Sequence, residues 1–134
     1  MDDSLIARMG TARFSVDDAD PVMSSSKHVQ VDLPPDRSAA RVARDALAAL
    51  TASEEAQLVV GELVTNAVMH GSPPISLSAM PDPRGLRVAV RDGRPDLGPA
   101  ARDSRGFRLV EAFALEWGID SHSDGKVVWA VLPI

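Results

Sequence analysis

The hydrophobic and polar positions along the chain follow first the period of a strand and then that of a helix. Residues 27–33, KHVQVDL, alternate polar and apolar side chains, as a half-buried strand does. Residues 36–50 repeat alanine, valine and leucine at intervals of three and four, which is typical of an amphipathic helix, and Asp36 is a candidate N-cap. A second helix is expected to begin after Ser53 as N-cap and to end at Gly71.

The second half of the chain predicts more strands than helices. Its segments are strands at 74–80 and 86–92 joined by PDPRG, a loop at 93–103, a helix from about Ser104, and strands at 116–121 and 126–133. This order favours an α+β fold with the helices on one face of a largely antiparallel sheet. Residues 1–26 show no steady period and end in a serine run. We interpret them as a flexible extension with a candidate strand at 13–16, followed by one domain at 27–134.

Composition narrows the functional classes. The net charge of -5, with scattered Lys and Arg residues, argues against nucleic acid as the main partner. The absence of cysteine excludes disulfides and cysteine-based metal sites. No apolar run has the length of a membrane span, and no secretion signal is visible, so we expect a cytoplasmic protein without membrane contact.

The second helix contains the stretch GELVTNAVMHG, in which Glu62, Asn66 and His70 recur at steps of four. Such spacing places all three on one stripe of the helix. The opposite face is apolar and consists of Val60, Leu63, Val64, Ala67 and Val68. The arc of the polar stripe also contains Leu58, Val59 and Met69. The stripe is therefore either the solvated side of an ordinary amphipathic helix or the wall of a pocket.

Glu62 and Asn66 are candidates for chemistry as well as for a surface role. An amide oxygen one turn from a carboxylate suits Mg²⁺, which takes few protein ligands and keeps several waters. Glu62 can then deprotonate a nucleophile beside it. The alternative is a surface pair of polar side chains that contributes a few tenths of a kcal/mol.

Two further signals lie in the second half. Asp92, followed by Gly93, ends a predicted strand, where a carboxylate can accept a hydrogen bond from a ligand amine; Asp-Gly is equally a common turn. The stretch DSRGFR places a glycine in the first turn of a helix. The N–H groups there can bind phosphate with help from Arg105 or Arg108, although a helix start with solvated arginines has the same pattern.

The order of these signals resembles a known family. The segments GELVTNAVMHG, VAVRDGRPDL, SRGFRLVEAFALEWGID and GKVVWAVLP are similar to the N box, G1 box, G2 box and last strand of GHKL-type ATPases, above all the small anti-sigma-factor serine kinases of bacteria. The resemblance covers residues 27–134. It implies a Bergerat-type two-layer α/β sandwich, with a mostly antiparallel sheet, three helices on one face, and a nucleotide between the two layers.

The resemblance also implies roles for individual residues. Asn66 corresponds to the Mg²⁺ ligand, Glu62 to the general base, and Asp92 to the acceptor of the adenine amino group, which favours ATP over GTP. The implied cofactor site consists of Asn66, Asp92, Gly93, Arg105 and Gly106. His70 is expected to stabilise the end of its helix, and Lys126 is interpreted as a turn lysine without a catalytic role.

The function implied is that of an ATP- and Mg²⁺-dependent serine/threonine protein kinase. Such a protein phosphorylates an anti-anti-sigma partner and sequesters a sigma factor. Arg94, Ser104 and the short segment between Asp92 and Gly106 depart from the family pattern. They favour an alternative, a catalytically weak or inactive Bergerat-fold module that sequesters a partner without phosphoryl transfer. The stripe of the helix at 36–50 fits a homodimer or partner interface and a core face equally.

Overall fold

The computed structural model describes residues 28–95 and 105–133, and of Arg105 and Gly106 it describes the backbone alone. The elements are β1 (Val29–Leu33), α3 (Ala39–Leu47), α4 (Glu54–His70), β2 (Ile75–Asp82), β3 (Gly85–Asp92), α6 (Arg105–Phe113), β4 (Glu116–His122) and β5 (Gly125–Leu132). The predicted α+β class is confirmed, and the expected strands and helices are found within a few residues of their predicted positions.

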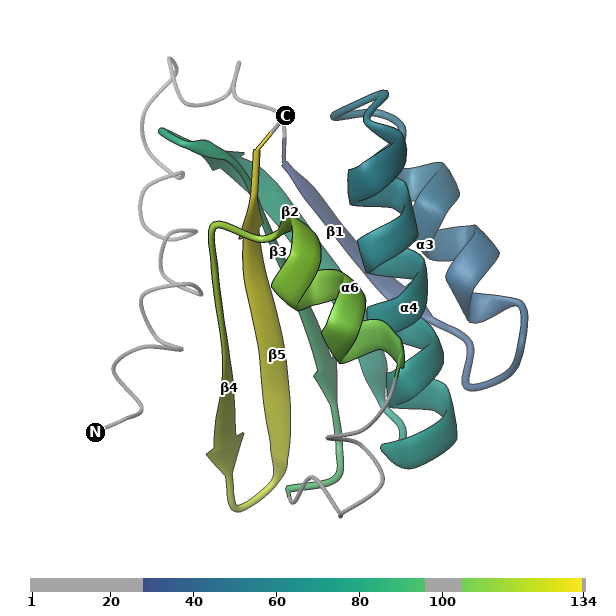
Figure 1. Ribbon diagram of the computed structural model, residues 1–134. Coiled ribbons are helices and arrows are strands. Elements are labelled where there is room, and N and C mark those ends of the chain that lie inside the picture. The colour runs from purple at the N-terminus through teal and green to yellow at the C-terminus, as the bar shows by residue number, and fades with distance from the viewer. Residues whose placement is uncertain (1–27, 96–104, 134) are drawn as a thin grey trace, which may run out of the picture.

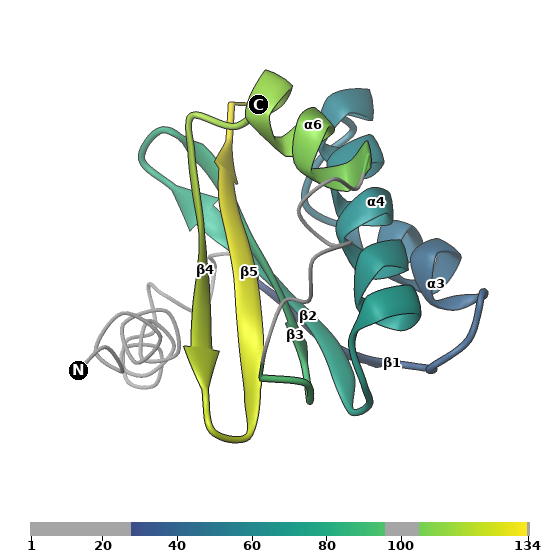
Figure 2. The same ribbon diagram turned by 60° about the horizontal axis from the view of Figure 1, so that its bottom comes forward.

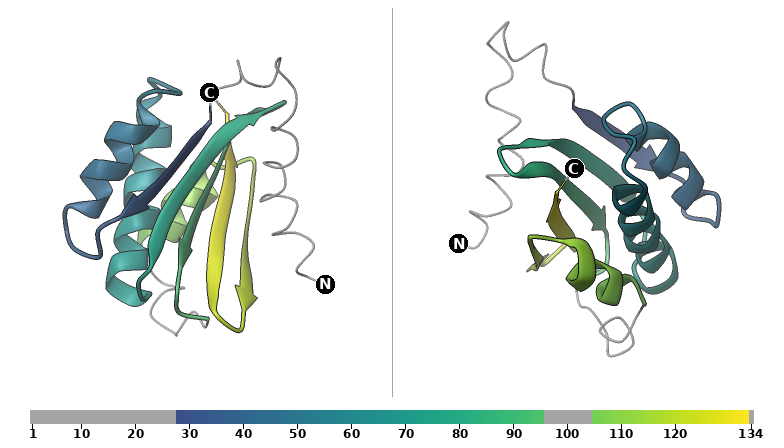
Figure 3. Two further views of the ribbon diagram at one scale, coloured as in Figure 1. Left: turned by 180° about the vertical axis from the view of Figure 1, so that it is seen from behind. Right: turned by 45° about the horizontal axis from the view of Figure 1, so that its top comes forward.

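The described strands form one five-stranded sheet in the order β1-β2-β3-β5-β4. All neighbouring strands in it are antiparallel. The helices α3, α4 and α6 cover one face (Figure 1), and a turned view separates the two layers clearly (Figure 2). From behind, the sheet lies in front of the helices (Figure 3). This is the two-layer sandwich expected from the sequence.

α4 begins and ends where its sequence predicts. The side chain of Ser53 accepts a hydrogen bond from the N–H of Ala56 at 3.1 Å, and two glutamates in the first turn oppose the positive end of the helix dipole. At the other end, the N–H of Gly71 donates to the carbonyl of Ala67 at 2.9 Å. The prolines that follow cannot extend the helix.

α3 begins later than predicted. The carboxylate of Asp36 accepts hydrogen bonds from the N–H of Ser38 at 2.8 Å and from its hydroxyl at 2.6 Å. Asp36 therefore closes the turn before the helix, and Ser38 occupies the N-cap position. The reason is local: a short acidic side chain binds an N–H two residues ahead as readily as it caps a helix.

The core lies between the helices and the sheet. The stripe of α3 is buried in it through Ala39, Ala43 and Leu47, so this stripe is a core face. Val59 is also in the core, which corrects its placement beside the polar stripe of α4. α4 lies between α3 and α6, so more of its circumference is covered than on a helix with one open side. Leu58 and Met69 stay exposed, at 46% and 68%.

Some predictions fall outside the described residues. These are the extension at 1–26, the candidate strand at 13–16, residue 27 as the start of the domain, and most of the loop at 93–103. Within the described part of the chain, no helix has both the length and the apolar character needed to cross a membrane.

Candidate functional site

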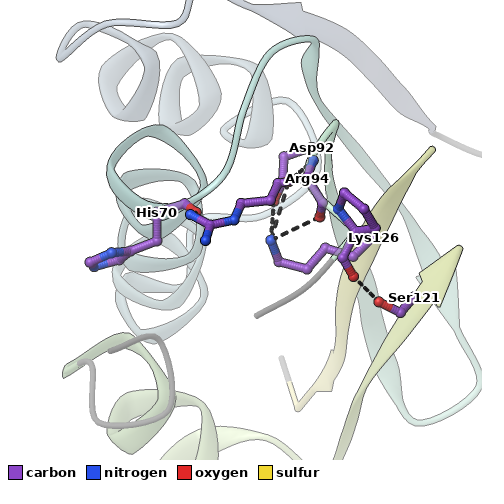
Figure 4. A network of polar contacts seen from close by, with 6 residues as sticks. His70, Asp92, Arg94, Ser121 and Lys126 are labelled. Atoms are coloured by element: carbon purple, nitrogen blue, oxygen red, sulfur yellow. Dashed lines mark hydrogen bonds and ion pairs between the residues drawn. The ribbon is translucent and has the colours of Figure 1, made fainter. Parts of the chain in front are cut away.

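A buried ion pair joins the ends of two central strands. Asp92, the last residue of β3, lies opposite Lys126 in β5. The Nζ atom of Lys126 is 3.0 Å from Oδ2 and 3.2 Å from Oδ1 of Asp92 (Figure 4). Asp92 is 2% exposed and Lys126 5%. Because an isolated charge is costly to bury, each group compensates the charge of the other at this depth.

The interpretation of Lys126 as a turn lysine is wrong. The turn between β4 and β5 lies at residues 123 and 124, and Lys126 is already inside β5. Alternation along this strand places Lys126 on the same face as Val128, Ala130 and Leu132, which belongs to the core. That signal was present in the sequence and could have identified Lys126 as an inward-facing cation.

Arg94 extends the network to the end of α4. Its backbone N–H donates to Oδ1 of Asp92 at 2.7 Å, and its carbonyl accepts from Nζ of Lys126 at 3.3 Å. Its guanidinium Nη1 donates to the carbonyl of His70 at 3.0 Å. Arg94 therefore satisfies a carbonyl of the last helical turn, which has no partner inside the helix. One residue that departs from the family pattern thus connects α4 to the Asp92 carboxylate.

Two glycines pack closely against Asp92. A Cβ atom added to Gly71 would lie 2.5 Å from Cγ of Asp92. Gly125 has a φ of +152°, a conformation that favours glycine, and a Cβ there would collide with the backbone carbonyl of Asp92. Gly71 thus lies against the carboxylate of Asp92, and Gly125 lies against its backbone carbonyl.

A small cavity lies between α4 and the sheet. Its polar lining consists of Asn66 and His70 from α4 together with Asp92 and Lys126 from the strands. Its volume is about 20 Å³, which is room for one water molecule. The structure therefore brings Asn66 and Asp92, which were predicted to share a site, to one cavity.

The apolar wall of this cavity differs from the prediction. It includes Leu63 and Ala67 of α4 and Phe107 of α6, whereas Leu58 and Met69 take no part in it. The ring of Phe107 stacks on that of Trp117, with 5.3 Å between the centroids. The cavity thus lies beside the edge of the polar stripe that faces α6.

Glu62 lines a different hollow from Asn66. It lies in a groove of about 320 Å³ beside α3, together with Arg44, Gln57, Leu58 and others. Four residues of an α-helix turn through roughly 400°, so Asn66 is rotated by roughly 40° from Glu62 around the helix. This offset is enough to place the two side chains in neighbouring hollows.

The remaining predicted residues are placed only in part. Gly93 follows Asp92, and its N–H donates to the carbonyl of Ser72 at 2.6 Å. Arg105 and Gly106 lie in the first turn of α6, as the sequence predicts, but the side chain of Arg105 is outside the described structure. Among the described residues, no group of three or more His, Asp or Glu side chains is arranged to hold a metal ion.

An antiparallel sheet covered by helices on one face, with a small cavity between the layers, defines a two-layer α+β domain. The histidine kinase-like ATPase domain matches residues 26–132, and the chain belongs to this family. Membership implies ATP binding, with Mg²⁺ as its usual companion. A comparison with curated proteins found no match.

Proposed function

We propose that the chain is an ATP-dependent serine/threonine protein kinase that phosphorylates an anti-anti-sigma partner and sequesters a sigma factor. The observation that supports this best is that Asn66 of α4 and Asp92 of β3 line one cavity between the helices and the sheet. An acceptor for a base amine and an amide ligand for a metal thus face the same space.

The residues of this site fit ATP and Mg²⁺ chemically. The buried carboxylate of Asp92 accepts from the exocyclic amine of adenine. The amide oxygen of Asn66 serves as a Mg²⁺ ligand, while phosphates and waters complete the coordination. Arg105 and Gly106, in the first turn of α6, offer N–H groups and charge to the phosphates.

Glu62 is proposed as the general base. It lies one helical turn from Asn66 and faces the open groove beside α3, through which a serine of the partner can approach. Glu62 accepts the hydroxyl proton as the serine oxygen bonds to the γ-phosphorus and ADP leaves. Phosphoryl transfer depends mainly on positioning and charge neutralisation, so these few groups suffice.

The test is transfer of labelled phosphate from Mg-ATP to an anti-anti-sigma protein. Glu62→Gln should lower the rate by about 10² or more, the usual contribution of a general base, and should leave ATP binding intact. Glu55→Gln, an exposed acid in the first turn of the same helix, is the matched control and should transfer normally. Equal rates in the wild type and Glu62→Gln would remove Glu62 from the mechanism.

A binding module without chemistry is the second candidate. It is favoured by the position of Glu62 outside the cavity of Asn66 and Asp92, and by the bridge that Arg94 makes to α4. In that case Mg-ATP and Mg-ADP should stabilise the chain equally. The chain should still bind its partner protein, but it should transfer no phosphate to that partner. Measurable transfer by the wild type would reject this candidate.

A further inference from the structure

Lys126 faces the same cavity as Asp92, so a hydrogen-bond donor lies beside the acceptor proposed for the adenine amine. We propose that Lys126 is a second base-reading residue, whose ammonium donates to N1 of the adenine that Asp92 holds by its amine. This inference rests on the nucleotide site proposed above and adds a specificity-determining residue to it.

The hydrogen bonds of Asp92 leave an acceptor available. Oδ1 accepts from the N–H of Arg94 and from Lys126, which uses both of its lone pairs. The contact that the described residues make with Oδ2 is the one from Lys126 at 3.0 Å. A carboxylate oxygen has two lone pairs, so Oδ2 can bind a ligand amine without losing its ion pair.

The ammonium of Lys126 can supply the neighbouring donor. It has three N–H groups, and its contact with the carbonyl of Arg94, at 3.3 Å, is the longest of those measured. A ligand acceptor can replace this weak contact at little cost, while the two contacts with Asp92 hold the ammonium at the edge of the cavity.

Adenine carries its exocyclic amine next to the ring acceptor N1, so its edge presents a donor and an acceptor side by side. The pair of Asp92 and Lys126 presents the complementary acceptor and donor, which were found adjacent across β3 and β5. A 6-oxopurine in the same pose would place its carbonyl toward the carboxylate of Asp92 and its N1–H toward the ammonium of Lys126, so both hydrogen bonds would be lost. The preference for ATP over GTP expected from Asp92 alone should therefore be stronger in this chain.

The experiment that tests this inference is a double-mutant cycle in which one change is made in the protein and the other in the ligand. The full chain and Lys126→Met are titrated calorimetrically with Mg-ATP and with 1-deaza-ATP, which lacks the N1 acceptor; 7-deaza-ATP, altered on the opposite side of the base, is the ligand control. The wild type should bind 1-deaza-ATP about tenfold or more weakly than ATP, the factor expected for a hydrogen bond from a charged donor, and 7-deaza-ATP like ATP. In Lys126→Met the difference between ATP and 1-deaza-ATP should disappear.

Two results would overturn the inference while leaving the nucleotide site intact. One is equal affinity of the wild type for ATP and 1-deaza-ATP, a measurement that needs no variant and stands even if Lys126→Met does not fold. The other is a Lys126→Met protein that still binds 1-deaza-ATP as much more weakly than ATP as the wild type does, because another group must then contact N1. A wild-type chain that binds none of these nucleotides would instead refute the proposed function, and this inference with it.

Discussion

Gly71, at the end of α4, lies directly against the carboxylate of Asp92, at the end of β3. A Cβ atom at Gly71 would be 2.5 Å from Cγ and 2.6 Å from Oδ2 of that carboxylate, and 2.7 Å from the carbonyl of Ala67. The position of the helix end and the position of the acid are therefore fixed together.

Gly71→Ala should consequently destabilise the fold and weaken nucleotide binding. Overpacking of this kind costs about 1–3 kcal/mol, because neither the buried carboxylate nor the helix carbonyl can move freely. Gly61→Ala is the control on the same helix, since its Cβ would meet mainly the mobile end of Arg44. There the better helix propensity of alanine should offset the contact. Urea denaturation measures the free energy of unfolding of both variants. Equal values for the two would refute the crowding at Gly71.

Lys126→Met should lower stability by about 3–5 kcal/mol, because it leaves the Asp92 carboxylate buried without its counter-ion. Adding Asp92→Asn should restore much of the loss, since no charge then remains to be buried. Arg84→Met provides the exposed comparison: Arg84 pairs with Asp82 and Glu116 at the surface, and its loss should change the unfolding midpoint little. A Lys126→Met protein as stable as Arg84→Met would show that the buried pair contributes nothing.

Asn66→Ala should remove the Mg²⁺-dependent part of ATP binding while leaving binding of the metal-free nucleotide nearly unchanged. The reason is that the amide oxygen of Asn66 is the proposed protein ligand of the ion. Thermal shifts with ATP, with and without Mg²⁺, measure this difference. Gln57→Ala removes another amide from α4, one that lines the groove beside α3, and should behave like the wild type. An unaltered response to Mg²⁺ in Asn66→Ala would exclude Asn66 as the ligand.

The fluorescence of Trp117 should report nucleotide binding. A cavity of about 20 Å³ cannot admit a purine, so a wall must move for the base to enter, and we expect that wall to be Phe107 of α6. Phe107 stacks on Trp117, and the environment of that indole must change when Phe107 moves. The chain has two tryptophans, so Trp129→Phe isolates the signal of Trp117, and Trp117→Phe isolates that of Trp129. A response to Mg-ATP from Trp129 alone would contradict this opening at α6.

Acid should weaken the turn before α3. Hydrogen bonds from the hydroxyl and then from the backbone N–H of Ser38 hold the pKa of Asp36 below its ordinary value of 3.8. The contribution of this group to stability is therefore present above pH 3.8 and is lost as the pH falls through the lower folded pKa. Titration by NMR should find the pKa of Asp36 depressed in the wild type and in Ser53→Ala, and raised toward 3.8 in Ser38→Ala. An identical pKa in all three proteins would refute the cause.

The sequence predicted the fold because its signals are local and periodic. Ser53 and Gly71 bound α4 through capping geometry that depends on neighbouring residues alone. The strands β2 and β3 follow from alternation on either side of a turn. The prediction of Asp36 as the N-cap was less reliable, because a turn and a helix cap use the same side-chain chemistry. The choice between them depends on the path of the backbone that follows.

The site was predicted in part, for a different reason. Asn66 and Asp92 could be placed together through the resemblance to a family, but the partner of Asp92 depends on which strands are neighbours. Lys126 comes opposite Asp92 because β5 returns to the middle of the sheet, beside β3. Strand order is a property of the whole chain. The residues around Lys126 indicate that it faces inward, but they do not indicate that β5 pairs with β3. The separation of Glu62 from Asn66 likewise depends on the packing of α3 and α6 around α4.

The central place of β5 also sets the order in which the protein can mature during synthesis. β4 is translated before β5 and has no strand to pair with until residues 125–132 exist, since β5 separates it from β3. A nascent chain that stops short of this segment presents β3 as an unpaired edge, the kind of backbone that promotes aggregation. A chain that ends before residue 125 therefore lacks the strand that completes both the sheet and the charge balance at Asp92.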